Sequence, residues 1–234
     1  KYNCNNFFFT DEALPINFLR TFAAKIIEQK VDVQWTGELK FEKSLLKDDR
    51  MDLLYKSGCR KLIFGLESYN QRVLDSMKKG VELSWVDETA ERCIKLGIAM
   101  HFYLICGFPT ETREEVMDSI NFVLNNQRLL DSPGFSAILS QFDLERGAPI
   151  ENNPMEWGIT KLYTPPEHDL SLGYSYETSI GMNAEETNEL YQQLIEKLGR
   201  EVMTFPHNYS LSDGLLYLAY HQKHSLTERL GTLA

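Results

Sequence analysis

The strongest constraint on the fold is a strand-and-helix unit that occurs twice, with glycines at the same places around the strand. In residues 97–112, an apolar run of strand length starts after Gly97 and stops at Gly107-Phe108-Pro109, and an acidic amphipathic helix follows at once. Residues 58–68 repeat the order of glycine, apolar strand, glycine and acid, with Glu67 at the strand's carboxyl end. Two such units predict parallel strands whose carboxyl ends share one face, where α/β proteins bind ligands.

The same signals extend along the chain and predict an α/β fold. Five parallel strands are expected near residues 6–10, 33–38, 61–66, 100–106 and 135–143, curved into an open barrel, with helices between them. The 234 residues suffice for one sizeable core. We expect residues 1–150 to form the barrel, and residues 151–234 to form an irregular wrap followed by helices at 184–203 and 212–224 that pack on it.

Alternation within the strands predicts which side chains face the barrel interior. In residues 31–40 the polar side chains fall on alternate positions that end with Glu38 and Lys40, so they share one side of the strand. In residues 60–67 the larger apolar side chains should face the helices, which leaves Glu67 at the inner rim. The expected interior set of the central strand is His101, Tyr103 and Ile105. The helix at 111–126 is predicted to begin with Thr110 as its N-cap.

Four acids, Asp11, Glu38, Glu67 and Glu111, fall at or just past strand carboxyl ends. Acids are common at such exposed positions, so one alone carries little information, but four in register favour a functional rim. No Gly-rich phosphate loop or Gly-x-Ser-x-Gly sequence is present. His221 and His224, three residues apart, fit a solvated helix face better than a metal site, and His101 is open to substrate contact or a hydrogen-bonded core role.

Composition excludes several classes of partner. A formal net charge of -10 gives no strong nucleic-acid signal, and no apolar run reaches the roughly 18 residues of a membrane span or resembles a secretion signal, so we expect a cytoplasmic protein. The four cysteines lie far apart without metal-site spacing. Buried reduced thiols are expected at Cys59, Cys93 and Cys106, whereas Cys4 has no predicted place.

Several segments together resemble one known family, the radical S-adenosylmethionine (SAM) enzymes, and in particular the branch whose members often carry a cobalamin-binding domain upstream. The similar segments are Phe9-Thr10-Asp11-Glu12, residues 58–68, residues 70–74, Met77-Lys78-Lys79-Gly80 and residues 107–112. They cover residues 6 to 150 in family order. The resemblance implies a partial (βα)6 TIM-like barrel that lacks its first βα unit and has a helical carboxyl-terminal extension.

The resemblance also implies a [4Fe-4S] cluster that cleaves SAM reductively to a 5'-deoxyadenosyl radical, which attacks a substrate. Asp11 matches the position near the methionine amino group, and Lys40 is the nearest match to the basic residue that faces the methionine carboxylate. Glu38 belongs to the same cofactor-binding rim. The ribose region is matched by Glu67, Ser68 and Gln71, and the strand beside adenine by Ile105 and Gly107.

One departure from the family limits these expectations. The Cys-x3-Cys-x2-Cys run that ligates the cluster is absent, so we expect no metal ligands in this chain and interpret it as an inactive fragment of a longer enzyme. Cobalamin would require an upstream domain. The substrate, a small molecule or a macromolecule, stays unidentified. Alternatives are a non-catalytic barrel used for binding or scaffolding, and a TIM-barrel hydrolase or lyase that uses the rim acids. Self-association through the open barrel edge is also expected.

Overall fold

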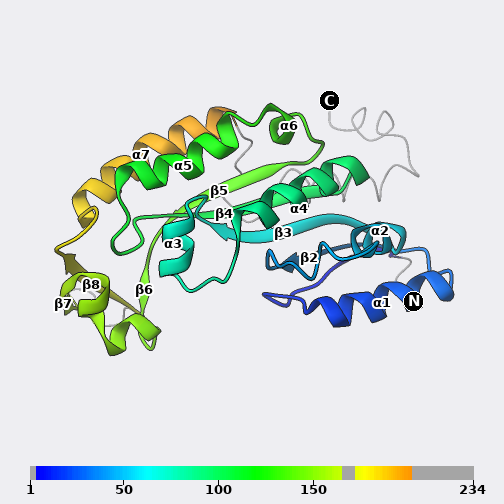
Figure 1. The fold of residues 1–234 in the computed structure, drawn as a ribbon, viewed down its shortest axis with the longest axis horizontal. Helices are drawn as coiled ribbons and strands as arrows, with labels where there is room; N and C mark the ends of the chain where they lie inside the picture. The colour runs from blue at the N-terminus through cyan, green and yellow to red at the C-terminus, as the bar shows by residue number, and fades with distance from the viewer. Residues whose placement is uncertain (1–3, 165–171, 202–234) are drawn as a thin grey trace, which may run out of the picture.

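A five-stranded parallel sheet forms the centre of the molecule in the computed structural model, which describes residues 4–164 and 172–201 (Figure 1). Its strands are β1 (Asn6–Phe8), β2 (Gln34–Leu39), β3 (Cys59–Glu67), β4 (Ala99–Cys106) and β5 (Ser136–Gln141). Their spatial order equals their sequence order, and every neighbouring pair is parallel. The sheet curls into a half-barrel, which confirms the predicted fold class and all five strands.

Helices connect successive strands, as the repeated unit predicts. They are α1 (Ile16–Glu28), α2 (Arg50–Lys56), α3 (Gln71–Ser76), α4 (Leu83–Leu96), α5 (Arg113–Leu124) and α6 (Gln127–Leu130), and α7 (Ala184–Glu201) follows late in the chain. In Figure 1, α7 runs beside α5. This helix corresponds to the one expected at 184–203, whereas the helix expected at 212–224, with His221 and His224, lies outside the described residues.

One continuous core joins the strands to the helices, and it follows the predicted parity. The set Leu62, Phe64 and Leu66 of β3 is completely buried toward the helices, and so are the alternate residues of β4. Phe41 and Phe64 stack with ring centroids 4.3 Å apart within this core. The opposite parity of β4 is partly exposed, since Tyr103 keeps 37% of its surface accessible. The two faces of the sheet therefore differ as expected, with apolar packing outside and an open, more polar inner face.

The start of α5 corrects the predicted N-cap. Thr112, not Thr110, caps this helix: its hydroxyl accepts from the N–H of Glu115, whose carboxylate accepts in return from the N–H of Thr112. This reciprocal arrangement is a capping box. Thr110 instead occupies the preceding turn with a φ of 77°, a left-handed conformation that a β-branched residue rarely adopts.

The described residues between 144 and 178 contain more regular structure than predicted. A three-stranded antiparallel sheet is made of β6 (Leu144–Glu145), β7 (Ile159–Tyr163) and β8 (Gly173–Thr178). Two short 3-10 helices, η1 (Pro149–Asn152) and η2 (Pro154–Trp157), lie between β6 and β7 in the chain. A second apolar cluster joins residues of this sheet to Val73 of α3 and to Phe108 in the turn after β4. Residues 159–163 and 173–178, for which irregular structure was expected, are thus strands of a small cap beyond the carboxyl ends of β4 and β5 (Figure 1).

In the part of the chain that the structure describes, no helix combines the length and the apolar composition that crossing a bilayer requires.

Candidate functional site

Two of the predicted rim carboxylates and one lysine gather at the carboxyl ends of β2 and β3. Lys79 Nζ lies 2.8 Å from Glu67 Oε1 in an ion pair whose members are both mostly shielded from solvent. The pKa of Glu38 is raised, first by burial and then by the negative charges of Glu67 and Glu12, while Lys79 opposes the rise. The three side chains therefore form one electrostatically coupled group, which we call the rim cluster.

Local backbone geometry aims Glu67 into this cluster. The register between β3 and β4 shifts between Gly65 and Glu67, and Glu67 has a φ of 62°. Such a bulge re-aims a side chain at the end of a strand. A Cβ at position 65 would lie 2.5 Å from Glu67 Oε1 and 3.5 Å from Lys79 Nζ. Gly65 thus provides the space in which the acid and the lysine meet, and a larger residue would displace the pair.

Lys79 was not among the site residues predicted from the sequence. It belongs to the loop between α3 and α4, twelve residues after Glu67, and only the tertiary structure brings it back to the rim. The segment Met77-Lys78-Lys79-Gly80 carried part of the family resemblance, and that was the available signal. Lys40, the predicted basic residue, is exposed just beyond the end of β2, and Asp11 is exposed between β1 and α1.

Ser68 and Gln71 serve local structure in this conformation. The Ser68 hydroxyl is fully buried and lies 3.3 Å from the hydroxyl of Ser119 on α5. The Gln71 amide donates to the carbonyl of Val81, and its oxygen accepts from the N–H of Leu83 at the start of α4. Both side chains thus fix the loops around Glu67 without joining the rim cluster.

The turn after β4 is close-packed around Gly107. Ile105 is partly exposed on the inner face of the sheet, and Gly107 has a φ of 87°. A Cβ at position 107 would lie 2.2 Å from Thr187 Cγ2, so α7 approaches the backbone here as closely as only glycine permits. Tyr176 of β8 donates to the carbonyl oxygen of Gly107 over 3.4 Å. The turn therefore joins β4, the antiparallel cap and α7.

Glu111 corrects the prediction that it belongs to the open rim. Its side chain is completely buried and folds back to accept the N–H groups of Gly107 at 2.8 Å and Phe108 at 3.2 Å. Its other oxygen, Oε1, has no hydrogen-bond partner. Burial raises the pKa of this carboxyl to about 7, although the two N–H groups act in the opposite direction. The residue acts as an internal brace of the turn.

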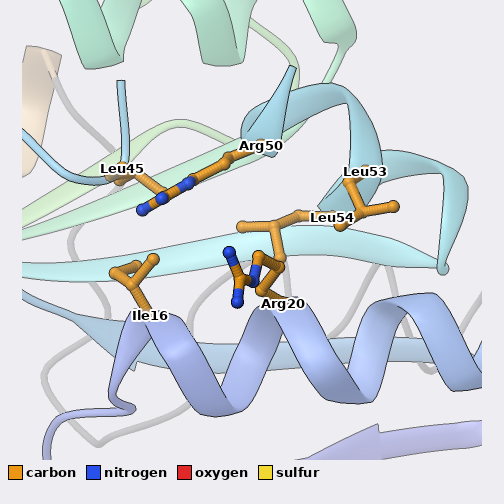
Figure 2. Close-up of a pocket in the computed structure, with 6 residues that line it drawn as sticks. All are labelled: Ile16, Arg20, Leu45, Arg50, Leu53 and Leu54. Atoms are coloured by element: carbon orange, nitrogen blue, oxygen red, sulfur yellow. The ribbon is translucent and has the colours of Figure 1, made fainter. Parts of the chain in front are cut away.

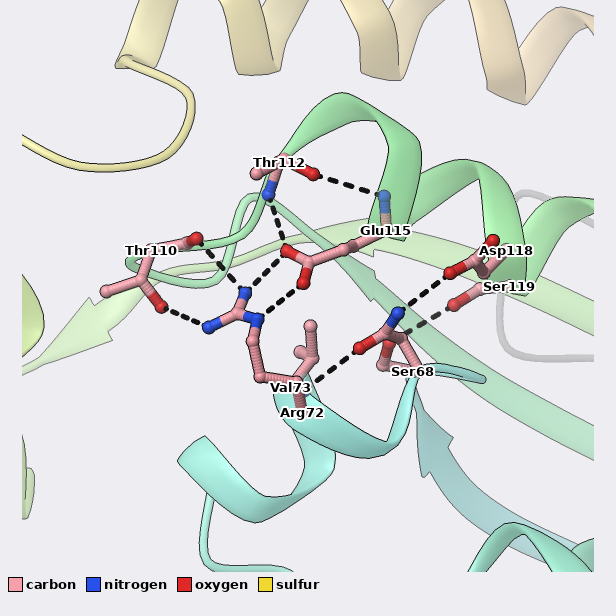
Figure 3. Close-up of polar contacts among 9 residues, drawn as sticks. Ser68, Arg72, Val73, Thr110, Thr112, Glu115, Asp118 and Ser119 are labelled. Carbon is pink, nitrogen blue, oxygen red and sulfur yellow. Dashed lines mark hydrogen bonds and ion pairs between the residues drawn. The ribbon is translucent and has the colours of Figure 1, made fainter.

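Arg72 connects this turn to the loop after β3 (Figure 3). Its Nε and Nη2 donate to both carboxylate oxygens of Glu115, while Nη1 donates to Thr110 Oγ1 and Nη2 to the Thr110 carbonyl, each over 3.1 Å. Nearby, Asn70 donates to Asp118 over 2.7 Å. The carboxyl-end loops of β3 and β4 are thus held together by side chains of α3 and α5.

A separate shallow pocket lies between α1 and α2, on the helix side of the sheet (Figure 2). It is lined by Ile16, Arg20, Leu45, Arg50, Leu53 and Leu54. Arg50 already donates to the carbonyl of Ser44 over 2.7 Å. No rim residue contributes to this pocket, so it is not part of the candidate site.

The side chains of the described residues do not fit a resident iron-sulfur cluster. Cys59, Cys93 and Cys106 are buried in the core, as predicted, and Cys4 is exposed. Across residues 4–164 and 172–201, no three histidine, cysteine or acidic side chains are grouped closely enough to hold a metal ion. The rim cluster, by contrast, places carboxylate acceptors and an ammonium donor side by side, which are groups that can bind hydroxyls and carboxylates.

Comparison with known proteins agrees with this fold. Residues 19–123 match the family model described as the radical SAM superfamily. The chain is 28% identical over 124 residues to the uncharacterized methyltransferase PH0819 of Pyrococcus horikoshii, and 27% identical over 126 residues to the bacteriochlorophyllide d C-12(1)-methyltransferase of Chlorobaculum tepidum. These alignments cover 52% and 53% of this chain and 27% of each relative. The chain therefore spans about a quarter of the length of these curated relatives.

Solved structures show the same architecture. The cobalamin-dependent SAM radical enzyme OxsB with aqua-cobalamin bound superposes with a TM-score of 0.58 at 14% identity, covering 82% of this chain and 34% of that one. Coproporphyrinogen III oxidase (HemN) from Escherichia coli superposes with a TM-score of 0.50 at 13% identity, covering 80% of this chain and 38% of that one. At these identities the likeness concerns the fold.

Proposed function

Because residues 19–123 of this chain match the family model described as the radical SAM superfamily, we propose that the chain supplies the SAM-binding rim of a longer radical SAM enzyme. In that enzyme a [4Fe-4S] cluster would be ligated by residues other than those described here. SAM held at this rim would supply, on reductive cleavage, a 5'-deoxyadenosyl radical for hydrogen abstraction from a substrate. Among the residues that the structure describes, no group of side chains could hold a cluster, so the proposed task of this chain is to bind and orient SAM.

The observation that carries the proposal is the rim cluster. Glu67 offers a carboxylate acceptor for ribose hydroxyls, and Lys79 offers a cation for the methionine carboxylate at the same place. We assign Lys79 this role in preference to the exposed Lys40, because the charge of Lys79 already acts on both Glu67 and Glu38. Asp11 stays the proposed partner of the methionine amino group, and Ile105 and Gly107 the surface beside adenine. Ser68 and Gln71 would hold the ribose loop.

The curated relatives suggest an outcome for the whole protein. Both carry the name methyltransferase, so we propose that the complete enzyme transfers a methyl group, with cobalamin held by an upstream domain. The substrate would enter beside the antiparallel cap, which lies beyond the carboxyl ends of β4 and β5. A non-catalytic binding module is the second candidate, favoured by the absence of cluster ligands among the described residues.

SAM binding by the isolated chain tests the site. Titration of the ¹⁵N-labelled chain with SAM, followed by NMR chemical shifts, should give weak binding, because each open-rim polar contact contributes only about 0.5 to 1.5 kcal/mol. Lys79→Met and Glu67→Gln should each weaken binding up to about tenfold, and Lys40→Met by less. The matched control is Glu91→Gln, which removes the ion pair with Arg128 on the outer helices.

Two results would reject the proposal in different ways. Equal loss of binding in the control and in the rim variants would show that the rim is not the site. Absence of 5'-deoxyadenosine from the reduced, cluster-loaded longer protein, measured by chromatography, would favour the non-catalytic module even if SAM binds.

A further inference from the structure

Arg72 makes four hydrogen bonds although about half of its side chain is exposed to solvent. Its guanidinium makes two hydrogen bonds to Glu115 and two to Thr110, although the Arg72 side chain keeps 48% of its surface accessible. The Glu115 side chain is only 15% accessible, and the hydrogen bonds from Arg72 are the main cause of its lowered pKa. A planar fork with several donors is the group that can satisfy a carboxylate and a neighbouring turn together.

The residue that Arg72 holds is conformationally strained. Thr110 has a φ of 77°, which is costly for a β-branched side chain and persists only where the surroundings determine it. Arg72 binds both its hydroxyl and its carbonyl oxygen. On the other side, a Cβ on Gly181 would lie 2.6 Å from the Thr110 carbonyl carbon, and Met182 donates its N–H to the Glu111 carbonyl over 2.9 Å. The turn is therefore clamped from two directions.

This clamp joins the two parts of the proposed SAM groove. The turn carries Gly107, on the proposed adenine side, and Arg72 belongs to the helix that directly follows the loop bearing Glu67 and Ser68. We infer that Arg72 is a positioning residue: its guanidinium sets the distance between the ribose-binding loop after β3 and the adenine-side turn after β4. The inference rests on the proposed function, since it assigns Arg72 to the same site without contact with SAM.

The chain offers variants that separate this role from general stability. Arg72→Met should remain folded, because Asn70–Asp118, Tyr69–Ser119 and Ser68–Ser119 still bond the loop to α5. Arg72→Lys keeps the charge but cannot reach Glu115 and both Thr110 oxygens together, so it should not restore the wild-type behaviour. Arg92→Met is the matched control, because Arg92 pairs with Glu88 along the exposed side of α4.

Two measurements test the inference. Hydrogen exchange of the amides in residues 107–112 should become about tenfold faster in Arg72→Met and Arg72→Lys, and unchanged in Arg92→Met. NMR titration should show SAM affinity lowered by about tenfold in both Arg72 variants, since small misplacements of binding groups have large effects. The exchange measurement does not depend on SAM.

The outcomes are distinguishable. Faster exchange with unchanged SAM affinity would show that the turn is held by Arg72 but that this does not position the groove, which overturns the inference. Unchanged exchange would overturn it at the first step. Wild-type protein without SAM binding, together with faster exchange in the variants, would instead reject the proposed function and leave Arg72 a structural residue. Wild-type exchange rates and SAM affinity in Arg72→Lys would show that the positive charge alone holds the turn, which overturns the role given to the guanidinium geometry.

Discussion

Glu111 makes the stability of the fold depend on pH. Its pKa is about 7 in the folded chain against an ordinary 4.5, so the folded state binds this proton more tightly than the unfolded state does. Its contribution is fully present below pH 4.5 and is lost as the pH rises through about 7, by about 3 kcal/mol in total. Glu111→Gln should abolish this decline in the free energy of unfolding, measured by urea denaturation between pH 4.5 and 8. An unaltered decline in Glu111→Gln would contradict this prediction. The control is Glu114→Gln, which changes an exposed neighbouring carboxylate.

Single residues were predictable where a strand determined them. Alternation along β2 and β3 placed Glu38 and Glu67 on the inner side, and the structure brings both into the rim cluster. Lys79 was missed because it lies in a loop, where no regular alternation of side chains predicts that it comes back to the rim. Glu111 occupied the expected place along the chain, but its carboxylate turns inward to satisfy two backbone N–H groups that the turn leaves unpaired. The alternation of apolar and polar residues does not indicate that a side chain outside a strand turns inward in this way.

Helix α5 depends on its capping box. Thr112→Ala removes the acceptor of the Glu115 N–H and should lower the free energy of unfolding by about 1 kcal/mol. Urea denaturation at a fixed pH measures the change. Thr21→Ala is the control, because the Thr21 hydroxyl donates to the Asn17 carbonyl in the exposed part of α1 and caps nothing. A loss in the control as large as in Thr112→Ala would argue against the capping role.

Elements with a clear period were predicted well. Strong apolar runs bounded by glycines gave β3 and β4 nearly to the residue, and the predicted helices between strands all exist. The N-cap of α5 was displaced by two residues, since two threonines in Thr110-Glu111-Thr112 offer the same side chain and only the backbone geometry distinguishes them. The antiparallel cap was missed because β6 has two residues and β7 is interrupted by a register shift, which leaves too little alternation to detect.

In the part of the molecule that the structure describes, β1 lies at one edge of the parallel sheet. In the described part of the chain, β1 pairs only with β2, and Phe7 and Phe8 remain 53% and 55% accessible. We expect self-association through this edge, seen by light scattering as a mass that rises with concentration. Phe8→Lys should shift association to about tenfold higher concentration, whereas Met155→Lys, at another exposed apolar residue, should not. A constant monomer mass at all concentrations would refute the expectation.

The architecture was predictable because a repeated βα unit admits few topologies. The antiparallel cap was not predictable, since its packing involves Val73 and Phe108, which lie far away in the sequence.

Three of the four cysteine thiols are buried, which leaves Cys4 as the thiol accessible to reagents. Burial raises the pKa of Cys106 to about 12 and also raises the pKa of Cys59 and of Cys93 above the ordinary value, so at neutral pH none of them presents a thiolate to an alkylating dye. Cys4 is exposed two residues before β1 begins. A maleimide fluorophore should therefore attach once per chain, next to the open edge, and energy transfer between labelled copies would report directly whether two such edges meet.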